Sequence, residues 1–241
     1  MAEQNVGAFS NSFKRNSISM VLPAFNEEGN IEEAVTKSRQ TLHEYFQKVE
    51  IIVVDDGSLD RTAELIDQMA NGSNEVVAIH HPKNKGYGAT LRSGFDKAQN
   101  ELIFFSDADL QFDIAEIKNF LKWIDQYEII TGYRIKRADN FMRKLNAWGW
   151  NNLVRVVLGV KIRDIDCAFK IFHREVFDII KLNSVGAMIN TEIFYLAKQH
   201  HMRVYEMPVN HYPRLNGEQS GANLKVIIKA FKELIRMYKR K

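Results

Sequence analysis

The sequence predicts an α/β protein with a parallel sheet at its centre. Short apolar runs alternate with segments of helical periodicity between Ile18 and Ile130, and this spacing favours βαβ units. Two of the apolar runs end in pairs of aspartates, as expected where an open α/β sheet binds a ligand at the carboxyl ends of its strands. No Gly-, Pro- or Ser-rich linker interrupts the chain, so we expect one domain with a C-terminal appendage.

The elements of the first half follow one another regularly. The apolar runs that predict strands are short and cover residues 18–22, 51–54, 76–79, 102–106 and 129–131. Between them, apolar residues recur three or four positions apart, which predicts helices. These helices contain Ile31 to Phe46, Leu65 and Met69, Leu91 and Phe95, and Ile114 to Ile124.

The second half is less regular. Helices are predicted at residues 142–158, 175–180 and 191–199. Strands are predicted at 168–172 and 204–207, and the second should end at Pro208, which lacks a backbone N–H. A polar loop at 214–221 then leads into a long amphipathic helix at 222–238.

Composition excludes several classes of protein. The single cysteine, Cys167, rules out an internal disulfide and fits a reducing compartment. Residues 1–17 are polar and mostly small, so we expect a flexible tail rather than a signal peptide. No run of about 18 uncharged apolar residues predicts a membrane span. A net charge of +3 is too small to indicate nucleic-acid binding.

Asp107 and Asp109 are the strongest chemical signal in the chain. Two carboxylates one residue apart, at the end of a buried strand, can direct their oxygens to one point in a cleft. Without a counter-charge they repel each other and lose hydration, so the arrangement favours a hard divalent cation between them. A second pair, Asp55-Asp56, ends the strand at 51–54. We therefore expect a Mg²⁺ or Mn²⁺ site at Asp107 and Asp109, with positions open for a diphosphate.

Two strand-to-helix turns should border this site. In the first, Phe25 offers an aromatic face to a base or ribose, and Glu27 offers an acceptor for hydroxyls. Both also fit a plain turn, since acidic residues are favourable at a helix N-terminus. In the second turn, Asp60 is expected to cap the following helix, and Asp56 to accept hydrogen bonds from a nucleobase.

Several motifs then resemble a known family. The segments PAFNEE, VVDDGSLDRT, NKGYGATLRSG and FSDADLQ, in this order, resemble the family 2 glycosyltransferases of the GT-A fold. That fold is a Rossmann-like, mixed but mainly parallel sheet with helices on both faces. The second half resembles the dolichyl-phosphate mannose synthase branch, which includes bacterial polyprenyl-phosphate sugar synthases. The segments that carry this second resemblance are TGYRIKR, MRKLNAWGWNNLV, DIDCAFKIF, Thr191-Glu192-Ile193 and PRLNGEQSG.

The resemblance implies a role for each matching position. Nucleotide-sugar binding falls to Pro23, Phe25, Glu27, Val54, Asp56, Asp107, Ala108 and Arg214. Metal binding falls to Asp107, Asp109 and Gln111, and contact with the acceptor phosphate to Arg134 and Arg143. The catalytic residues are then Asp109, Arg134 and Arg143. Two positions depart from the family pattern, because Ala147 stands where Ser is common and Ser220 where Lys is common.

The implied reaction is an inverting, metal-dependent transfer of a sugar from a GDP- or UDP-linked donor to a polyprenyl phosphate. A single displacement would invert the anomeric carbon, and the anionic acceptor phosphate needs no strong base. Two alternatives remain open. One is a family 2 transferase with a soluble or glycan acceptor, and the other is a non-catalytic nucleotide-sugar binder. The donor base, the sugar and the lipid length are not fixed by any single residue.

The C-terminal segment 222–241 carries a second expectation. It combines an apolar stripe with seven Lys or Arg and one Glu between Lys225 and Lys241. A basic amphipathic helix fits peripheral contact with anionic lipid, and it equally fits packing on its own domain 18–221 or on another subunit. We expect a protein at the cytoplasmic face of a membrane, with a membrane-protein partner or a homo-oligomer as further possibilities.

A few polar residues stand outside these assignments. The pairs His80-His81 and His200-His201 are expected to have surface or packing roles, because adjacent side chains rarely chelate one ion. Cys167 should be buried. Secondary candidates for the acceptor side are Asp164, Asp166 and Glu192.

Overall fold

The computed structural model describes residues 15–135, 141–214 and 233–235. For residues 141–148 and 151 it describes only the helical backbone. The strands are β1 Arg15–Ala24, β2 Phe46–Asp55, β3 Val76–His80, β4 Leu102–Ser106, β5 Ile129–Ile135, β6 Phe169–His173 and β7 Val204–Asn210. The helices are α1 Ile31–Tyr45, α2 Thr62–Gly72, α3 Tyr87–Lys97, η1 Ile114–Glu116, α4 Ile117–Phe120, α5 Phe141–Leu158, α6 Val176–Ile179 and α7 Met188–Gln199.

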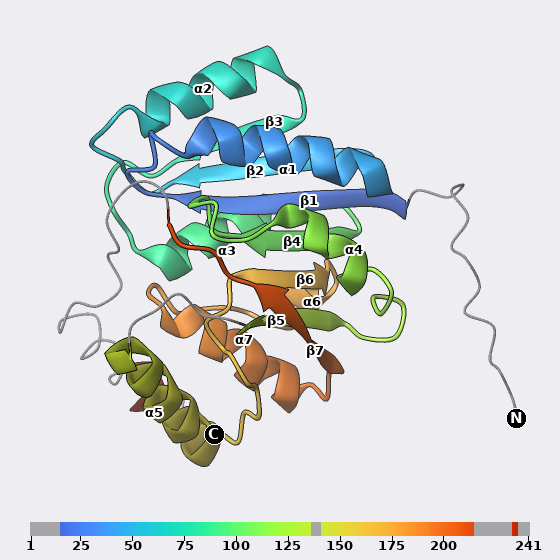
Figure 1. Ribbon diagram of the computed structural model, residues 1–241, viewed down its shortest axis with the longest axis vertical. Helices are drawn as coiled ribbons and strands as arrows, with labels where there is room; N and C mark the ends of the chain where they lie inside the picture. Colours follow the sequence, from blue (N-terminus) through green and yellow to red (C-terminus); the bar gives the residue numbers. More distant parts are fainter. Residues whose placement is uncertain (1–14, 136–140, 215–232, 236–241) are drawn as a thin grey trace, which may run out of the picture.

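All seven described strands form one sheet in the order β3-β2-β1-β4-β6-β5-β7. The pairings are parallel except those of β6, which runs antiparallel to both β4 and β5. The predicted mixed, mainly parallel sheet is therefore confirmed. The strand order reverses direction at β1, and right-handed crossovers then place α1 and α2 on one face and α3 on the other (Figure 1). The reversal leaves a crevice at the carboxyl ends of β1 and β4, where open sheets bind ligands.

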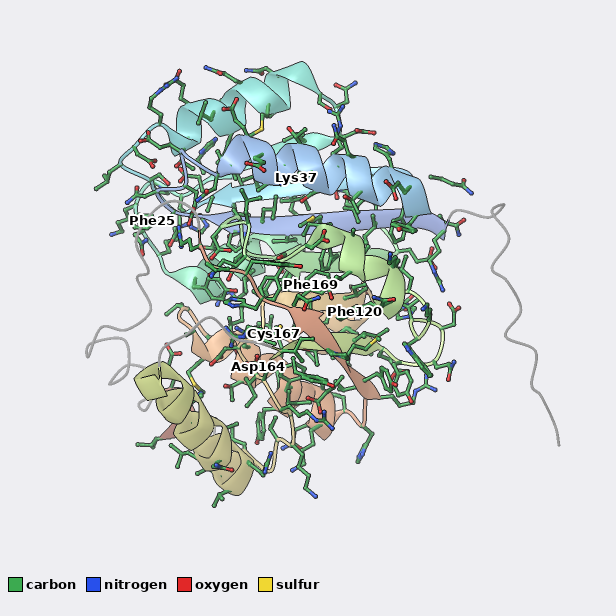
Figure 2. The ribbon with its side chains drawn as sticks, viewed as in Figure 1. Phe25, Lys37, Phe120, Asp164, Cys167 and Phe169 are labelled. Atoms are coloured by element: carbon green, nitrogen blue, oxygen red, sulfur yellow. The ribbon has the colours of Figure 1, made fainter. Side chains whose placement is uncertain are left out.

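The central strands are continuous apolar runs because both of their faces are covered. Every residue of β4 is buried. Alternate residues of a strand point to opposite faces, so Phe104 and Phe105 serve two aromatic clusters. Phe104 meets Phe169 with ring centroids 4.8 Å apart, whereas Phe105 stacks on Phe172 at 6.3 Å. Figure 2 shows Phe169 beside Phe120 in the first cluster, and their centroids are 4.8 Å apart.

Several predicted boundaries were wrong. β1 begins at Arg15 and overlaps the end of the predicted tail, because its backbone pairs with Phe46 at the start of β2. Phe46 itself was expected to close a helix and instead opens a strand. β7 continues through Pro208 to Asn210. It is an edge strand paired only with β5, so the missing N–H of proline costs no second ladder.

The helix predicted at 114–124 was also too long, since only η1 and the four-residue α4 form there and turns follow. Of the predicted helix at 222–238, residues 233–235 are described, and they are helical. The rest of that prediction, together with Ala147's side chain and Ser220, lies outside the described residues. Within the described part of the chain, no helix is long and apolar enough to cross a membrane.

Candidate active site

The turns after β1 and β2 are joined by reciprocal hydrogen bonds. The backbone N–H of Asn26 donates to Ser58 Oγ at 2.9 Å, and the N–H of Leu59 donates to Asn26 Oδ1 at 2.8 Å. Asn26 adopts a left-handed conformation with φ 56°, which Asn tolerates better than most residues. These bonds fix Phe25 at the rim, where the residue is 37% exposed and lies at the edge of the molecule (Figure 2).

Asp55 and Asp56 are buried, and both accept hydrogen bonds from the protein. Asp56 accepts the backbone N–H groups of Lys85 and Gly86, both at 2.8 Å, and its Oδ1 lies 2.7 Å from His81 Nδ1. Asp55 accepts the N–H of Ser58 at 3.0 Å. A carboxylate has about four lone-pair sites, so one acceptor site of Asp56 is left over from these three bonds. The pair therefore stabilises two neighbouring loops, the one at Ser58 and the one at Lys85 and Gly86.

Asp107 lies at the end of β4 and meets a side chain that the sequence analysis passed over. Tyr87, the first residue of α3, donates its hydroxyl to Asp107 Oδ1 at 3.0 Å. Desolvation raises the pKa of Asp107 to about 7, and the charge of Asp109 adds to this shift. The pKa of the Tyr87 hydroxyl is raised well above its usual value, first by desolvation and then by Asp107.

Two glycines place Tyr87. A Cβ on Gly86 would lie 2.5 Å from the carbonyl oxygen of Val185, and one on Gly88 would lie 2.6 Å from that of Gly186. Gly86 also has φ 101°, which side chains rarely allow. The start of α3 can therefore approach the 184–186 loop only because both residues are glycine, and this approach sets the position of the Tyr87 ring.

Asp109 belongs to a cluster with Glu27 and Arg214. The guanidinium of Arg214 donates to Glu27 Oε1, and its Nη1 lies 3.7 Å from Asp109 Oδ2. Desolvation raises the pKa of Asp109 and the nearby Glu27 adds to this, while the N–H of Gln111 and the charge of Arg214 oppose it. Glu27 also accepts Asn30 Nδ2 at 2.7 Å, so both of its carboxylate oxygens already have protein donors.

Gln111 connects this cluster to the segment after β7. Its side-chain Nε2 donates to the carbonyl of Tyr212 at 3.0 Å, and the N–H of Tyr212 returns a bond to the Gln111 carbonyl at 2.9 Å. The preceding Leu110 has φ 60°, an uncommon conformation for a γ-branched residue. The pair of bonds brings the segment after β7, which carries Arg214, against the Asp107–Gln111 loop.

The residues around Asp107 and Asp109 suit a divalent cation. Desolvation raises the pKa of both carboxylates, and a neighbouring negative charge adds to each shift, from Asp109 on Asp107 and from Glu27 on Asp109. Across the described ranges, no group of three or more His, Cys, Asp or Glu could hold an ion by itself. Mg²⁺ is commonly bound by one or two carboxylates while phosphate oxygens and water complete its shell. The donor set therefore fits a metal that arrives with a diphosphate.

Arg134, near the end of β5, is held by Asp164. Its Nε and Nη2 donate to the two oxygens of that carboxylate, each at 2.7 Å. Although desolvation opposes it, the bond and the charge of Asp164 raise the pKa of Arg134. Arg143 lies on α5, and its side chain is outside the described residues, so the structure does not test whether Arg134 and Arg143 converge.

The family model described as glycosyl transferase family 2 matches residues 19–180. The chain belongs to this family. The predicted membership is thus confirmed, and the matched segment spans β1 to α6, including the Asp107–Asp109 pair and Asp164.

Two similar proteins have names that include a polyprenyl phosphate. The chain is 29% identical, over 221 residues and 89% of its length, to an undecaprenyl-phosphate 4-deoxy-4-formamido-L-arabinose transferase from Proteus mirabilis. It is 31% identical, over 207 residues and 83% of its length, to a dodecaprenyl-phosphate galacturonate synthase from Rhizobium johnstonii. It spans only 65% and 60% of the lengths of these two relatives.

Solved structures show the same fold. The glucosyl-3-phosphoglycerate synthase from Mycobacterium tuberculosis in complex with UDP has a TM-score of 0.72 at 16% identity, covering 92% of this chain and 80% of that one. The complex of the same synthase with Mn²⁺, UDP and phosphoglyceric acid has a TM-score of 0.69 at 17% identity, covering 91% and 76%. The predicted GT-A fold is confirmed by this likeness.

Within this family 2 fold, three polar residues escaped the sequence analysis or were assigned elsewhere. Tyr87 stands inside a quoted motif, but its partner is 20 positions away. Lys170 offered a visible signal, as the one charged residue in an apolar strand. Glu192, a secondary candidate for the acceptor side, accepts the N–H groups of Asn183 and Ser184 at 2.9 and 2.7 Å, and so supports the loop that contacts α3.

The remaining expectations concern Cys167, His81 and three residues predicted to bind the nucleotide sugar. Cys167 is buried, and desolvation raises the pKa of its thiol to about 12. His81 packs between Asp56 and Ser93, with its Nε2 2.9 Å from Ser93 Oγ. Val54, Ala108 and Pro23 lie at the same edge of the sheet as the acidic residues, and Val54 and Ala108 are buried.

Proposed function

We propose that the protein is an inverting glycosyltransferase that moves a sugar from a nucleotide-linked donor to a polyprenyl phosphate, with Mg²⁺ or Mn²⁺ at Asp107 and Asp109. The observation that carries the proposal is this carboxylate pair at the end of β4, with both pKa values raised. Such a pair is costly to ionise unless a cation neutralises it. The family of the chain and the names of its relatives support the transfer reaction.

The donor occupies the crevice at β1 and β4. Phe25, exposed at the rim, offers a face to the base or ribose. Asp56 has one acceptor site beyond its bonds to the protein, enough for a single base N–H. The metal, when bound, neutralises the diphosphate and so makes it a better leaving group. Asp107 and Asp109 hold it there.

Arg214 changes partners as the donor binds. Without a ligand its guanidinium rests between Glu27 and Asp109. A diphosphate at this place is a stronger bidentate acceptor for the guanidinium, and Asp109 is then free to face the cation. Glu27 thus holds Arg214 ready instead of contacting ribose hydroxyls as its main task.

The bond changes are few. An oxygen of the acceptor phosphate attacks the anomeric carbon from the side opposite the diphosphate. The carbon–oxygen bond to the diphosphate breaks, and the nucleoside diphosphate leaves with the electron pair. Arg134, and Arg143 on α5, orient the acceptor phosphate and stabilise the developing charge. The phosphate is already anionic at neutral pH, so no proton has to be removed.

A polyprenyl chain places the reaction at a membrane surface. We assign the protein to the cytoplasmic face as a peripheral protein, with the basic segment 222–241 as the contact and a membrane protein or a second copy as further partner. A soluble phosphorylated acceptor is the second candidate, because a structural neighbour was solved with phosphoglyceric acid. Both acceptors share a phosphate, which is the group that the two arginines recognise.

The test is a transfer assay with radiolabelled UDP- and GDP-sugars. Each donor is combined with undecaprenyl phosphate, dodecaprenyl phosphate or 3-phosphoglycerate, with Mn²⁺ or with EDTA. The proposal expects Mn²⁺-dependent label in the organic phase with a polyprenyl phosphate. Label only in the aqueous phase would favour the soluble acceptor. Donor binding without transfer to any acceptor would contradict the enzyme assignment.

A further inference from the structure

Arg134 does not stand alone at the edge of β5. Its side-chain Nε and Nη2 and its own backbone N–H, at 3.1 Å, all donate to the single carboxylate of Asp164. Asp164 is only 6% exposed, and it lies 30 positions away in the sequence. β6 pairs with β5 only from Ile129 to Thr131. The Asp164 side chain therefore takes the place of a strand partner at Arg134.

The turn that carries Asp164 is fixed at its beginning. The backbone N–H of Arg163 donates to Glu206 of β7 at 2.7 Å. The Arg163 guanidinium lies over the ring of Tyr133, 4.8 Å from its centroid. Tyr133 precedes Arg134 on β5, so the turn and the strand hold each other on both sides of the ion pair.

The turn is also fixed at its end, by a buried cation. The N–H of Cys167 closes the turn on the Asp164 carbonyl at 3.2 Å. Lys170, which is fully buried, donates to the Cys167 carbonyl at 2.5 Å and to Asn190 Oδ1 of α7 at 2.9 Å. Its Nζ lies 4.9 Å from the ring centroid of Phe105 and 5.5 Å from that of Phe194. A charge this deep is tolerated only with such partners.

From this geometry we infer that Asp164 is a positioning residue for Arg134 and fixes the direction in which that guanidinium meets a phosphate. The inference rests on the proposed function, in which Arg134 contacts phosphate. Arginine has five N–H donors, and the bonds to the Asp164 side chain use two of them. The pair is neutral as a whole, so it contributes directed N–H groups rather than a free positive charge. Asp164 itself touches no reacting atom.

Binding and turnover should respond differently when the Asp164 charge is removed. In Asp164→Asn the site gains one positive charge, so anion binding should not weaken. The guanidinium loses its bidentate acceptor, however, and a misplacement of about 1 Å can cost about 100-fold in rate. We expect kcat to fall about 10- to 100-fold, while the KM values for donor and acceptor stay equal or decrease.

A double-mutant cycle with Arg134→Lys is the decisive experiment. The ammonium group of lysine cannot form the planar pair of hydrogen bonds that the Arg134 guanidinium makes with the Asp164 carboxylate. If Asp164 acts through Arg134, adding Asp164→Asn to Arg134→Lys should lower kcat little further, because the interaction is already lost. If Asp164 has only a structural role, its loss should multiply that of Arg134→Lys, and this result would overturn the inference. So would Asp164→Asn with the kcat of the unchanged protein.

Two controls keep the outcomes apart. Asp178→Asn removes the same charge from an exposed position on α6, and its kcat should stay within about fivefold. An equal loss in both variants would make the effect one of charge and would contradict positioning. UDP and GDP binding with MnCl₂, measured by calorimetry, should show an unchanged number of sites in folded Asp164→Asn. If that variant does not fold, Asp164→Glu, which keeps the charge but shifts the carboxylate by one methylene, enters the same cycle.

Failure of the inference is distinguishable from failure of the function. A protein that transfers no sugar to any phosphate acceptor defeats the proposed function before Asp164 is tested. If the protein transfers sugar, but the kcat losses of the Asp164 and Arg134 variants multiply in the double variant, the proposed function stands and only the positioning role of Asp164 is refuted.

Discussion

The two acidic pairs of this sheet have similar sequences and opposite surroundings. Asp55-Asp56 ends β2, and Asp107-Ala108-Asp109 follows β4, with only β1 between those strands. Asp56 alone accepts three hydrogen bonds from His81, Lys85 and Gly86. Asp107 and Asp109 receive few donors, lie near each other, and have raised pKa values. The first pair accepts hydrogen bonds from several protein donors. The second pair has few donors, so its negative charge is poorly compensated by the protein.

The difference teaches that a pair of aspartates at a strand end is not a site by its spacing alone. What matters is the supply of donors from segments far away in the sequence. Asp56 is 25 to 30 positions from its partners, and the loop that provides them is held in turn by that carboxylate. A pair that receives many protein donors is architectural, and a pair that receives few is reactive. Substitutions in the two pairs should therefore have different kinds of effect, on activity for Asp107 and Asp109 and on stability for Asp55 and Asp56.

The largest effect should come from the reactive pair. Asp109→Asn keeps the volume of the side chain but removes a charge that would face the proposed cation, so Mn²⁺-dependent transfer should fall about 1,000-fold or more. Initial rates at saturating Mn²⁺ measure this. Asp113→Asn, an exposed residue on the same loop, is the matched control and should keep most of its activity. Full transfer by the Asp109 variant would refute the metal assignment.

The architectural pair should respond in stability. Asp56→Asn places an NH₂ group against donors that need an acceptor, which costs about 1–3 kcal/mol of unfolding free energy. Urea denaturation of the metal-free protein measures the change. Asp67→Asn, whose side chain is 60% exposed, should change it far less. If the Asp56 variant kept its stability and lost only its affinity for the nucleotide sugar, Asp56 would be a ligand-binding residue and the division between the two pairs would be contradicted.

The third prediction concerns pH. The pKa of Asp107 is about 7 in the folded protein and about 4 in an unfolded chain, so the folded state binds this proton more tightly. The stability that the protonated group contributes is fully present below about pH 4 and is lost as the pH rises to about 7. Without metal, Asp107→Asn should therefore match the unchanged protein near about pH 4 and exceed its stability near about pH 8. If Asp107→Asn and the unchanged protein had equal urea midpoints at both pH values, a raised pKa of Asp107 would be contradicted.

The smallest effect should come from Tyr87. Its hydroxyl stabilises the ionised form of Asp107, the form that a cation requires. A hydrogen bond is worth about 1 kcal/mol, so Tyr87→Phe should raise the Mn²⁺ concentration for half-maximal activity about fivefold. Tyr45→Phe, at the far end of α1, serves as control. An unchanged Mn²⁺ requirement would remove Tyr87 from the site.

Most of the fold could be predicted because its signals are local. Apolar runs predicted the central strands β1, β2 and β4, since parallel strands covered on both faces are continuously apolar. The errors occurred where a distant partner decides. Phe46 has helical neighbours but pairs with Arg15, and Pro208 reads as a strand end although β7 is an edge strand that tolerates it.

The candidate site divides in the same way. Asp107 and Asp109 follow from the sequence because both are attached to one strand end. The contacts of Tyr87 with Asp107 and of Asp164 with Arg134 span 20 and 30 positions. Hydrophobic periodicity within a helix or strand cannot predict contacts between such distant residues. Glu27 was expected to face a ribose, and its engagement by Arg214, 187 positions later, was beyond the reach of any local pattern.

The reversed direction of β6 decides which segment reaches the carboxyl ends of the parallel strands. Because β6 runs against β4 and β5, the residues before it arrive at that edge, and the residues after it leave from the opposite one. The stretch from Gly159 to Cys167 therefore meets the end of β5, where Asp164 binds Arg134. A parallel β6 would have brought the segment after His173 to that edge in its place.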